Sequence, residues 1–90
     1  MLRYSNHFLA KLEDLISETD YILRYEKGNF KPGYCILNER KIIIVNKYYP
    51  VDGKINCLLE IIKIININPK DLSEKNRKLY YEQTQTEVKV

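Results

Sequence analysis

Residue types that build catalytic and cofactor sites are scarce in this sequence. Its 90 residues include one histidine, His7, and two cysteines, Cys35 and Cys57, which lie too far apart for a CxxC motif. A zinc site needs three or four histidine, cysteine or carboxylate ligands close together. We therefore expect no metal site, no cofactor and no catalytic residue, with His7 a solvated residue at the start of a helix.

Glycine and long apolar runs are scarce as well. The stretch "GNFKPG" holds two of the three glycines, and it has neither of the glycine orders that cradle phosphates. No segment approaches the roughly 18 apolar residues of a membrane helix, and the first residues lack the apolar run of a signal peptide. Both cysteines lie in apolar segments, where small buried hydrophobes are expected. These features predict a cytoplasmic protein with reduced cysteines.

The excess of basic charge is small. Fifteen lysines and arginines stand against twelve acidic residues, for a net charge of +3, whereas nucleic-acid domains usually cluster a larger charge. One nucleic-acid hypothesis stays open, because Arg40, Lys47, Tyr48 and Tyr49 combine rings that stack on bases with cations that hold phosphates. The other interpretation of the tyrosines is that they cover strands and the edges of the core.

What the sequence does contain is a clear change of hydrophobic period along the chain. Apolar residues between positions 8 and 16 follow helical spacing, residues 21–26, 34–37 and 41–46 are typical of strands, and residues 53–66 are apolar around most of a helix. A last helix begins at Pro69, capped by Asn68, or later, capped by Ser73. The pattern predicts a single α+β domain over residues 1–82 in the order α-β-β-β-α-α. We expect a three-stranded, mainly antiparallel sheet packed on helices, and a flexible tail at residues 83–90.

The third predicted strand is apolar on both faces. Ile42 and Ile44 lie on one face, and Ile43 and Val45 lie on the other. Such a strand needs cover on both sides, so we expect helices on one side and a second copy on the other. The leading hypothesis is a non-enzymatic domain that acts through protein–protein contact as a homodimer. The predicted interface consists of Ile43, Val45, Cys57, Ile61 and Ile64.

One carboxylate interrupts the apolar helix that follows this strand. Glu60 has Asn56 four positions before it and Lys63 three positions after it, so the three side chains share one helical face. Two interpretations stay open for this candidate polar site. It is either an exposed edge that carries an ion pair or a functional carboxylate.

The strand "KIIIVN", a short connection and the helix "DGKINCLLEIIK" together resemble the core of ImmA/IrrE-type metallopeptidase domains, over about Tyr34 to Asn66. In that family the helix carries a His-Glu-x-x-His motif, and the resemblance places Glu60 at the general-base position. Leu59 and Lys63 occupy the two metal-ligand positions, and neither side chain can bind zinc. The resemblance therefore implies an inactive or residual zincin-like scaffold, while a generic αβββαα pattern explains the same residues.

Overall fold

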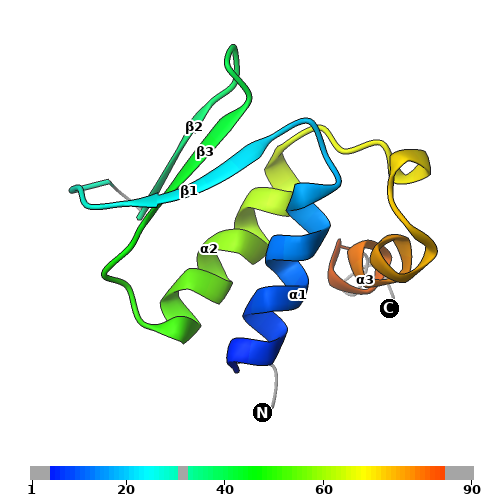
Figure 1. Ribbon diagram of the computed structural model, residues 1–90, viewed down its shortest axis with the longest axis horizontal. Helices are drawn as coiled ribbons and strands as arrows, with labels where there is room; N and C mark the ends of the chain where they lie inside the picture. The colour runs from blue at the N-terminus through cyan, green and yellow to red at the C-terminus, as the bar shows by residue number, and fades with distance from the viewer. Residues whose placement is uncertain (1–4, 31–32, 85–90) are drawn as a thin grey trace.

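The described residues form three α-helices and one three-stranded sheet, with all the helices on one side of the sheet (Figure 1). The computed structural model describes residues 5–30 and 33–84. The elements are α1 (Asn6–Ser17), β1 (Ile22–Glu26), β2 (Tyr34–Leu37), β3 (Ile42–Asn46), α2 (Val51–Ile64), the 3₁₀ turn η1 (Pro69–Asp71) and α3 (Glu74–Thr84). The predicted α+β class and element order are confirmed.

Short side chains fix both ends of α1. The hydroxyl of Ser5 caps the helix by accepting a 3.1 Å hydrogen bond from the backbone N–H of Phe8. At the other end, the hydroxyl of Thr19 donates to the carbonyl of Ile16 at 2.7 Å and accepts from the N–H of Tyr21 at 3.1 Å. These local bonds compete with further helical bonds, so α1 ends at Ser17, before Thr19, and the chain turns into β1.

Strand β3 lies in the centre of the sheet, in the order β1-β3-β2. Strands β2 and β3 pair antiparallel as a hairpin, whereas β1 pairs with β3 in parallel, with Ile22 opposite Ile42. The sheet is therefore mixed, and the expectation of a mainly antiparallel sheet holds only for the hairpin. The physical reason is that β3 is apolar on both faces and takes the position with a neighbour on each side, which separates β1 from β2.

At the end of the sheet opposite the β2–β3 hairpin turn, the connecting loops depend on Gly33 and Asn46. Gly33 has a φ of 120°, and a Cβ atom there would lie 2.5 Å from the ring of Tyr49, so a side chain does not fit. The Asn46 amide donates to the carbonyl of Gly28 at 3.2 Å and accepts from the N–H of Tyr48 at 3.0 Å. Asn46 thus joins the loop after β1 to the connection that leads to α2.

Helix α2 begins earlier than its sequence suggests. It runs from Val51 to Ile64 and not from residue 53 to 66, and Pro50 occupies the N-cap position. Asp52 lies in the first turn, where its carboxylate accepts from the N–H of Gly53 at 2.9 Å and interacts favourably with the helix dipole. The buried face of α2 packs on the sheet and on α1 to form the core.

Polar contacts hold α3 against α1. Both caps considered for the last helix are present, since the side chain of Asn68 caps η1 and that of Ser73 caps α3. The Asn76 side chain, only 1% exposed, donates to Asp14 Oδ2 at 2.9 Å, and the N–H of Ser73 donates to Glu18 Oε1 at 2.7 Å. Helix α3 includes positions 83 and 84, so the predicted tail starts too early, and its residues 85–90 lie outside the described residues.

These hydrogen bonds lower the pKa of both carboxyls. The Asn76 amide is the main cause for Asp14, and the Ser73 N–H is the main cause for Glu18. Each carboxylate therefore stabilises the folded state above its ordinary pKa, which is 3.8 for Asp14 and 4.5 for Glu18. This contribution is lost as the pH falls through the lowered values of the folded protein.

We expect acid to weaken the protein partly through these two groups. The free energy of unfolding, measured by urea denaturation at a series of pH values below about 5, should fall less steeply in the Asp14→Asn/Glu18→Gln double variant than in the wild type. A matched Asp20→Asn/Glu39→Gln variant changes two exposed carboxyls and should retain the wild-type slope. Identical slopes for all three proteins would contradict the role of Asp14 and Glu18.

Replacing Asn76 with alanine should destabilise the protein by about 1–3 kcal/mol, because it removes a buried hydrogen-bond donor and leaves Asp14 without it. Urea denaturation at neutral pH measures the loss. The exposed Asn66→Ala variant is the control and should change the stability by less than about 0.5 kcal/mol.

Candidate functional site

The residues that could hold a metal or act as nucleophiles lie apart from one another. His7 is exposed in the first turn of α1, Cys35 is half-buried on β2, and Cys57 is buried on α2. Within residues 5–30 and 33–84, no three His, Cys, Asp or Glu side chains are placed to hold a metal ion together. That the chain works without a metal stays a prediction.

The candidate polar site lies on the outer face of α2, where Asn56, Glu60 and Lys63 are all exposed. Tyr34 of β2 reaches this face. Burial raises the pKa of the Tyr34 hydroxyl, and its hydrogen bond to Glu60 raises it further. Burial likewise raises the pKa of the Cys57 thiol, with a smaller contribution from Glu60. The raised pKa values favour the protonated forms of the phenol and the thiol beside Glu60.

The four residues of the nucleic-acid hypothesis do not form one surface. Arg40 lies in the turn before β3, and Lys47 follows β3, so the five residues of the strand separate them by about 17 Å. Tyr48 is 68% exposed, and its ring lies 5.6 Å from the Nζ of Lys47. Tyr49 instead packs on the core beside Gly33. Only Lys47 and Tyr48 remain as neighbouring exposed groups.

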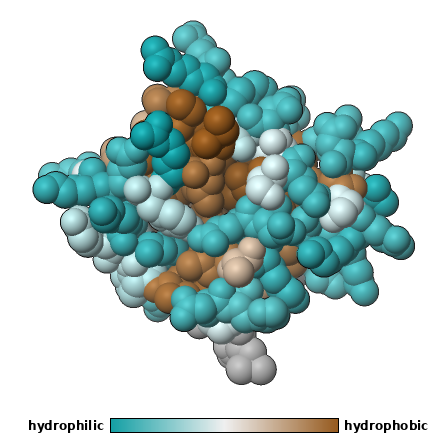
Figure 2. Space-filling view, in the orientation of Figure 1, coloured by the Kyte–Doolittle hydropathy of each residue, from teal (hydrophilic) through white to brown (hydrophobic). Residues whose placement is uncertain are grey.

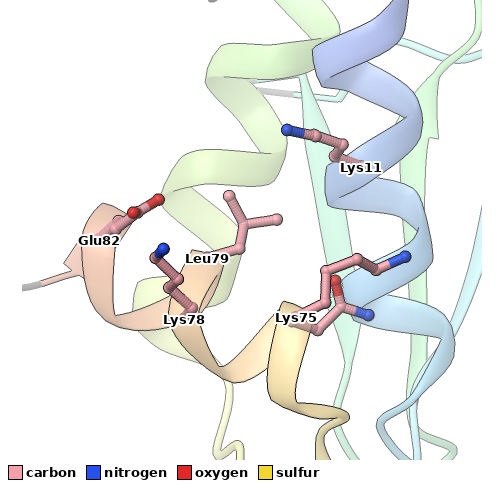
Figure 3. Close-up of a pocket in the computed structure, with 6 residues that line it drawn as sticks. Lys11, Lys75, Lys78, Leu79 and Glu82 are labelled. Carbon is pink, nitrogen blue, oxygen red and sulfur yellow. The ribbon is translucent and has the colours of Figure 1, made fainter.

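A groove of about 270 Å³ lies between α1 and α3 (Figure 3). Its lining consists of Lys11, Lys75, Asn76, Lys78, Leu79 and Glu82. Figure 3 shows Lys75 reaching toward α1, where its Nζ lies 3.5 Å from Asp14 Oδ2. Lys75 and Asn76 both bind the carboxylate that anchors α3, so this groove belongs to the contact between the two helices.

The predicted interface is wrong for four of its five residues. Ile43, Val45, Cys57 and Ile61 are buried in the core of the chain itself, and only Ile64, at 57% exposure, is accessible. The physical reason is the side on which the helices pack. They cover the face of β3 that carries Ile43 and Val45, so the opposite face is the one without cover.

That opposite face, here called the open sheet face, is apolar at its hairpin end. The register places Ile22, Ile42 and Leu37 in one row across the three strands, and Arg24, Ile44 and Cys35 in the next. Ile22 is 59% exposed and Leu37 is 40% exposed. At the other end Arg24 and Glu26 form a 2.7 Å ion pair. Figure 2 shows apolar side chains at the surface toward the hairpin end of the sheet, bordered by hydrophilic ones.

Comparison with protein-family models, curated proteins and solved structures gives no match for this chain. The kinship with ImmA/IrrE-type domains stays a prediction. The helix that carries Leu59, Glu60 and Lys63 does follow β3 after a short connection. In addition, none of the helices in the described part of the chain has the length and apolar character needed to cross a membrane.

The two cysteines should differ in reactivity because Cys57 is buried with a raised pKa, whereas Cys35 lies on the open sheet face. In dilute native protein, iodoacetamide should modify Cys35 at least about tenfold faster than Cys57. Mass spectrometry of the Cys35→Ser and Cys57→Ser variants measures each rate separately. If iodoacetamide modified Cys35 and Cys57 at equal rates in the native protein, and also at equal rates in urea, the result would contradict the burial of Cys57.

Proposed function

We propose that this protein is a non-enzymatic, cytoplasmic domain that acts through protein–protein contact and forms a homodimer through its open sheet face. The observation that carries the proposal is the row of Ile22, Ile42 and Leu37, which forms an apolar surface on the side of the sheet away from the helices. Contiguous exposed apolar patches on soluble proteins commonly mark contact sites.

A second copy suits this face because two sheets pack through apolar faces, and a two-fold axis brings identical surfaces together. The charges are compatible with this arrangement. Arg24 and Glu26 lie side by side at one end of the face, so a symmetric partner offers each of them a group of opposite sign.

The size of the face sets the strength of the proposed dimer. Three strands spaced by about 4.8 Å, with four or five residues each rising by about 3.3 Å, cover roughly 15 × 15 Å, or about 230 Å². A standard stable interface buries about 800 Å² per partner. The open sheet face is the centre of a small interface, and we expect a dissociation constant in the micromolar range or weaker.

The cysteines support the proposed cytoplasmic location, and the polar site supports the proposed non-enzymatic role. Cys35 and Cys57 are both free, as is usual in the reducing cytoplasm. Glu60 stands beside a phenol and a thiol whose pKa values are raised, which supports a structural role over a catalytic one.

Sedimentation velocity over about 1–500 µM protein tests the dimer. The wild type should show a rising average mass, and the Leu37→Lys variant should dissociate at least about tenfold more readily, because each copy then places a charge within the apolar row. The matched Ile64→Lys variant adds the same charge at an exposed position on α2 and should associate like the wild type. Circular dichroism confirms that each variant is folded.

A monomeric wild type at the highest concentration would overturn the proposed dimer. Dissociation caused by Ile64→Lys but not by Leu37→Lys would place the interface on α2 instead. Alkylation of Cys35 gives an independent measurement, since its rate should fall as the protein concentration rises.

A further inference from the structure

The free edge of β1 borders a groove that shares one residue, Ile22, with the open sheet face. Because the strand order is β1-β3-β2, one side of β1 has no neighbouring strand among residues 5–30 and 33–84. The groove lies between this edge and α1 and has a volume of about 430 Å³. Its lining consists of Glu13, Ile16 and Ser17 of α1 together with Tyr21, Ile22, Leu23 and Tyr25.

Backbone groups of β1 point into this groove. The N–H of Ile22 donates to the carbonyl of Lys41 at 2.8 Å, and the carbonyl of Glu26 accepts from the N–H of Lys47 at 3.0 Å, so both residues direct their backbone toward the β3 side. Backbone direction alternates along a strand, which turns the N–H and C=O groups of Leu23 and Tyr25 to the free edge. An extended chain laid along the edge meets two donors and two acceptors.

The edge lacks two of the features that prevent strand pairing, a proline and a charge that points toward the core. Strand β1 contains no proline, and its charged side chains, Arg24 and Glu26, lie on the open sheet face and not over the groove. Half-buried Leu23 gives the groove an apolar wall, while Ile16 lies fully buried beneath it. A partner strand therefore finds free backbone groups beside an apolar wall, which is the arrangement used for recognition by strand addition.

One carboxylate gives the groove its chemical preference. Glu13 Oε2 accepts a 2.5 Å hydrogen bond from the hydroxyl of Tyr25, and the described residues form no ion pair with Glu13. Burial raises the pKa of Tyr25, with a further contribution from Glu13, so the hydroxyl stays protonated and holds the carboxylate in place. A lysine or arginine on the incoming strand complements this charge.

The same carboxylate argues against a second copy of this chain as the occupant. Pairing two β1 edges brings the α1 helices of the two copies together across the groove, and with them the two Glu13 side chains. Like charges at such a contact oppose association.

We propose that the groove between α1 and the free edge of β1 binds an extended segment of another protein by strand addition, and that this segment carries apolar residues and a lysine or arginine on the side that faces α1. The groove shares Ile22 with the open sheet face but none of the residues of that face on β2 or β3, so the Leu37→Lys variant can weaken the dimer without changing the groove.

The test uses the full chain and a fluorescein-labelled peptide, Thr-Val-Thr-Lys-Thr-Val-Thr, blocked at its C-terminus, in which the valines and the lysine share one face of a strand. Fluorescence anisotropy should show saturable binding below about 1 mM. In ¹⁵N-labelled protein, the amide signals of Leu23 and Tyr25 should shift and exchange more slowly with water. A peptide with glutamate in place of lysine should bind less tightly.

Two controls separate the backbone from the charge. A peptide N-methylated at alternate residues keeps the side chains but loses hydrogen-bond donors, and it should not bind. The Glu13→Gln variant keeps an acceptor for the Tyr25 hydroxyl and should bind the lysine peptide about threefold to fivefold less tightly. The Leu37→Lys variant, designed to weaken the dimer, should bind the peptide like the wild type.

No saturable binding of the lysine peptide, equal binding of the N-methylated peptide, or equal binding of the glutamate peptide would each overturn the proposal. So would amide shifts confined to residues outside β1 and α1. None of these results bears on sedimentation of the wild type, so failure of the peptide site is distinguishable from failure of the dimer.

Discussion

The apolar character of both faces of β3 is the constraint on which the rest of the structure depends. Ile43 and Val45 are fully buried beneath the helices, and burying each such side chain is worth about 1.5–3 kcal/mol. Ile42 and Ile44 point the other way and are only partly covered. The first pair fixes where α1 and α2 lie, and the second pair leaves the apolar surface from which we infer self-association.

The helical layer combines apolar packing with a small set of directional polar contacts. Leu12, Leu15 and Ile16 bury α1 against the rest of the core. The bonds from Asn76 to Asp14 and from Ser73 to Glu18 specify one position for α3. Because α3 buries few apolar side chains of its own, these polar contacts do much to set its place.

Much of the fold could be predicted from the sequence, because helical and strand periods differ clearly in this chain. The helix of residues 8–16 and the apolar strand of residues 41–46 are confirmed to within a few positions. The sequence could not show which face of β3 the helices cover. Alternation separates Ile42 and Ile44 from Ile43 and Val45, but both pairs are equally apolar, so the predicted interface fell on the wrong side.

The parallel pairing of β1 with β3 could not be predicted from the sequence either, because strands that follow one another in sequence usually pair. The groove at the β1 edge depends on which face of β3 the helices cover and on the pairing of β1 with β3. No sequence pattern indicated the groove directly.

The position of β3 between two strands that precede it in the chain has a consequence for how the protein is made. On the ribosome, β1 and β2 emerge first, and in the finished protein neither pairs with the other. A nascent chain that ends before residue 42 contains both edge strands, β1 and β2, but lacks the central strand β3. The sheet can assemble only after β3 has been translated and has inserted between β1 and β2. Until then, the apolar surfaces of α1 and β1 lack the residues that cover them in the finished protein.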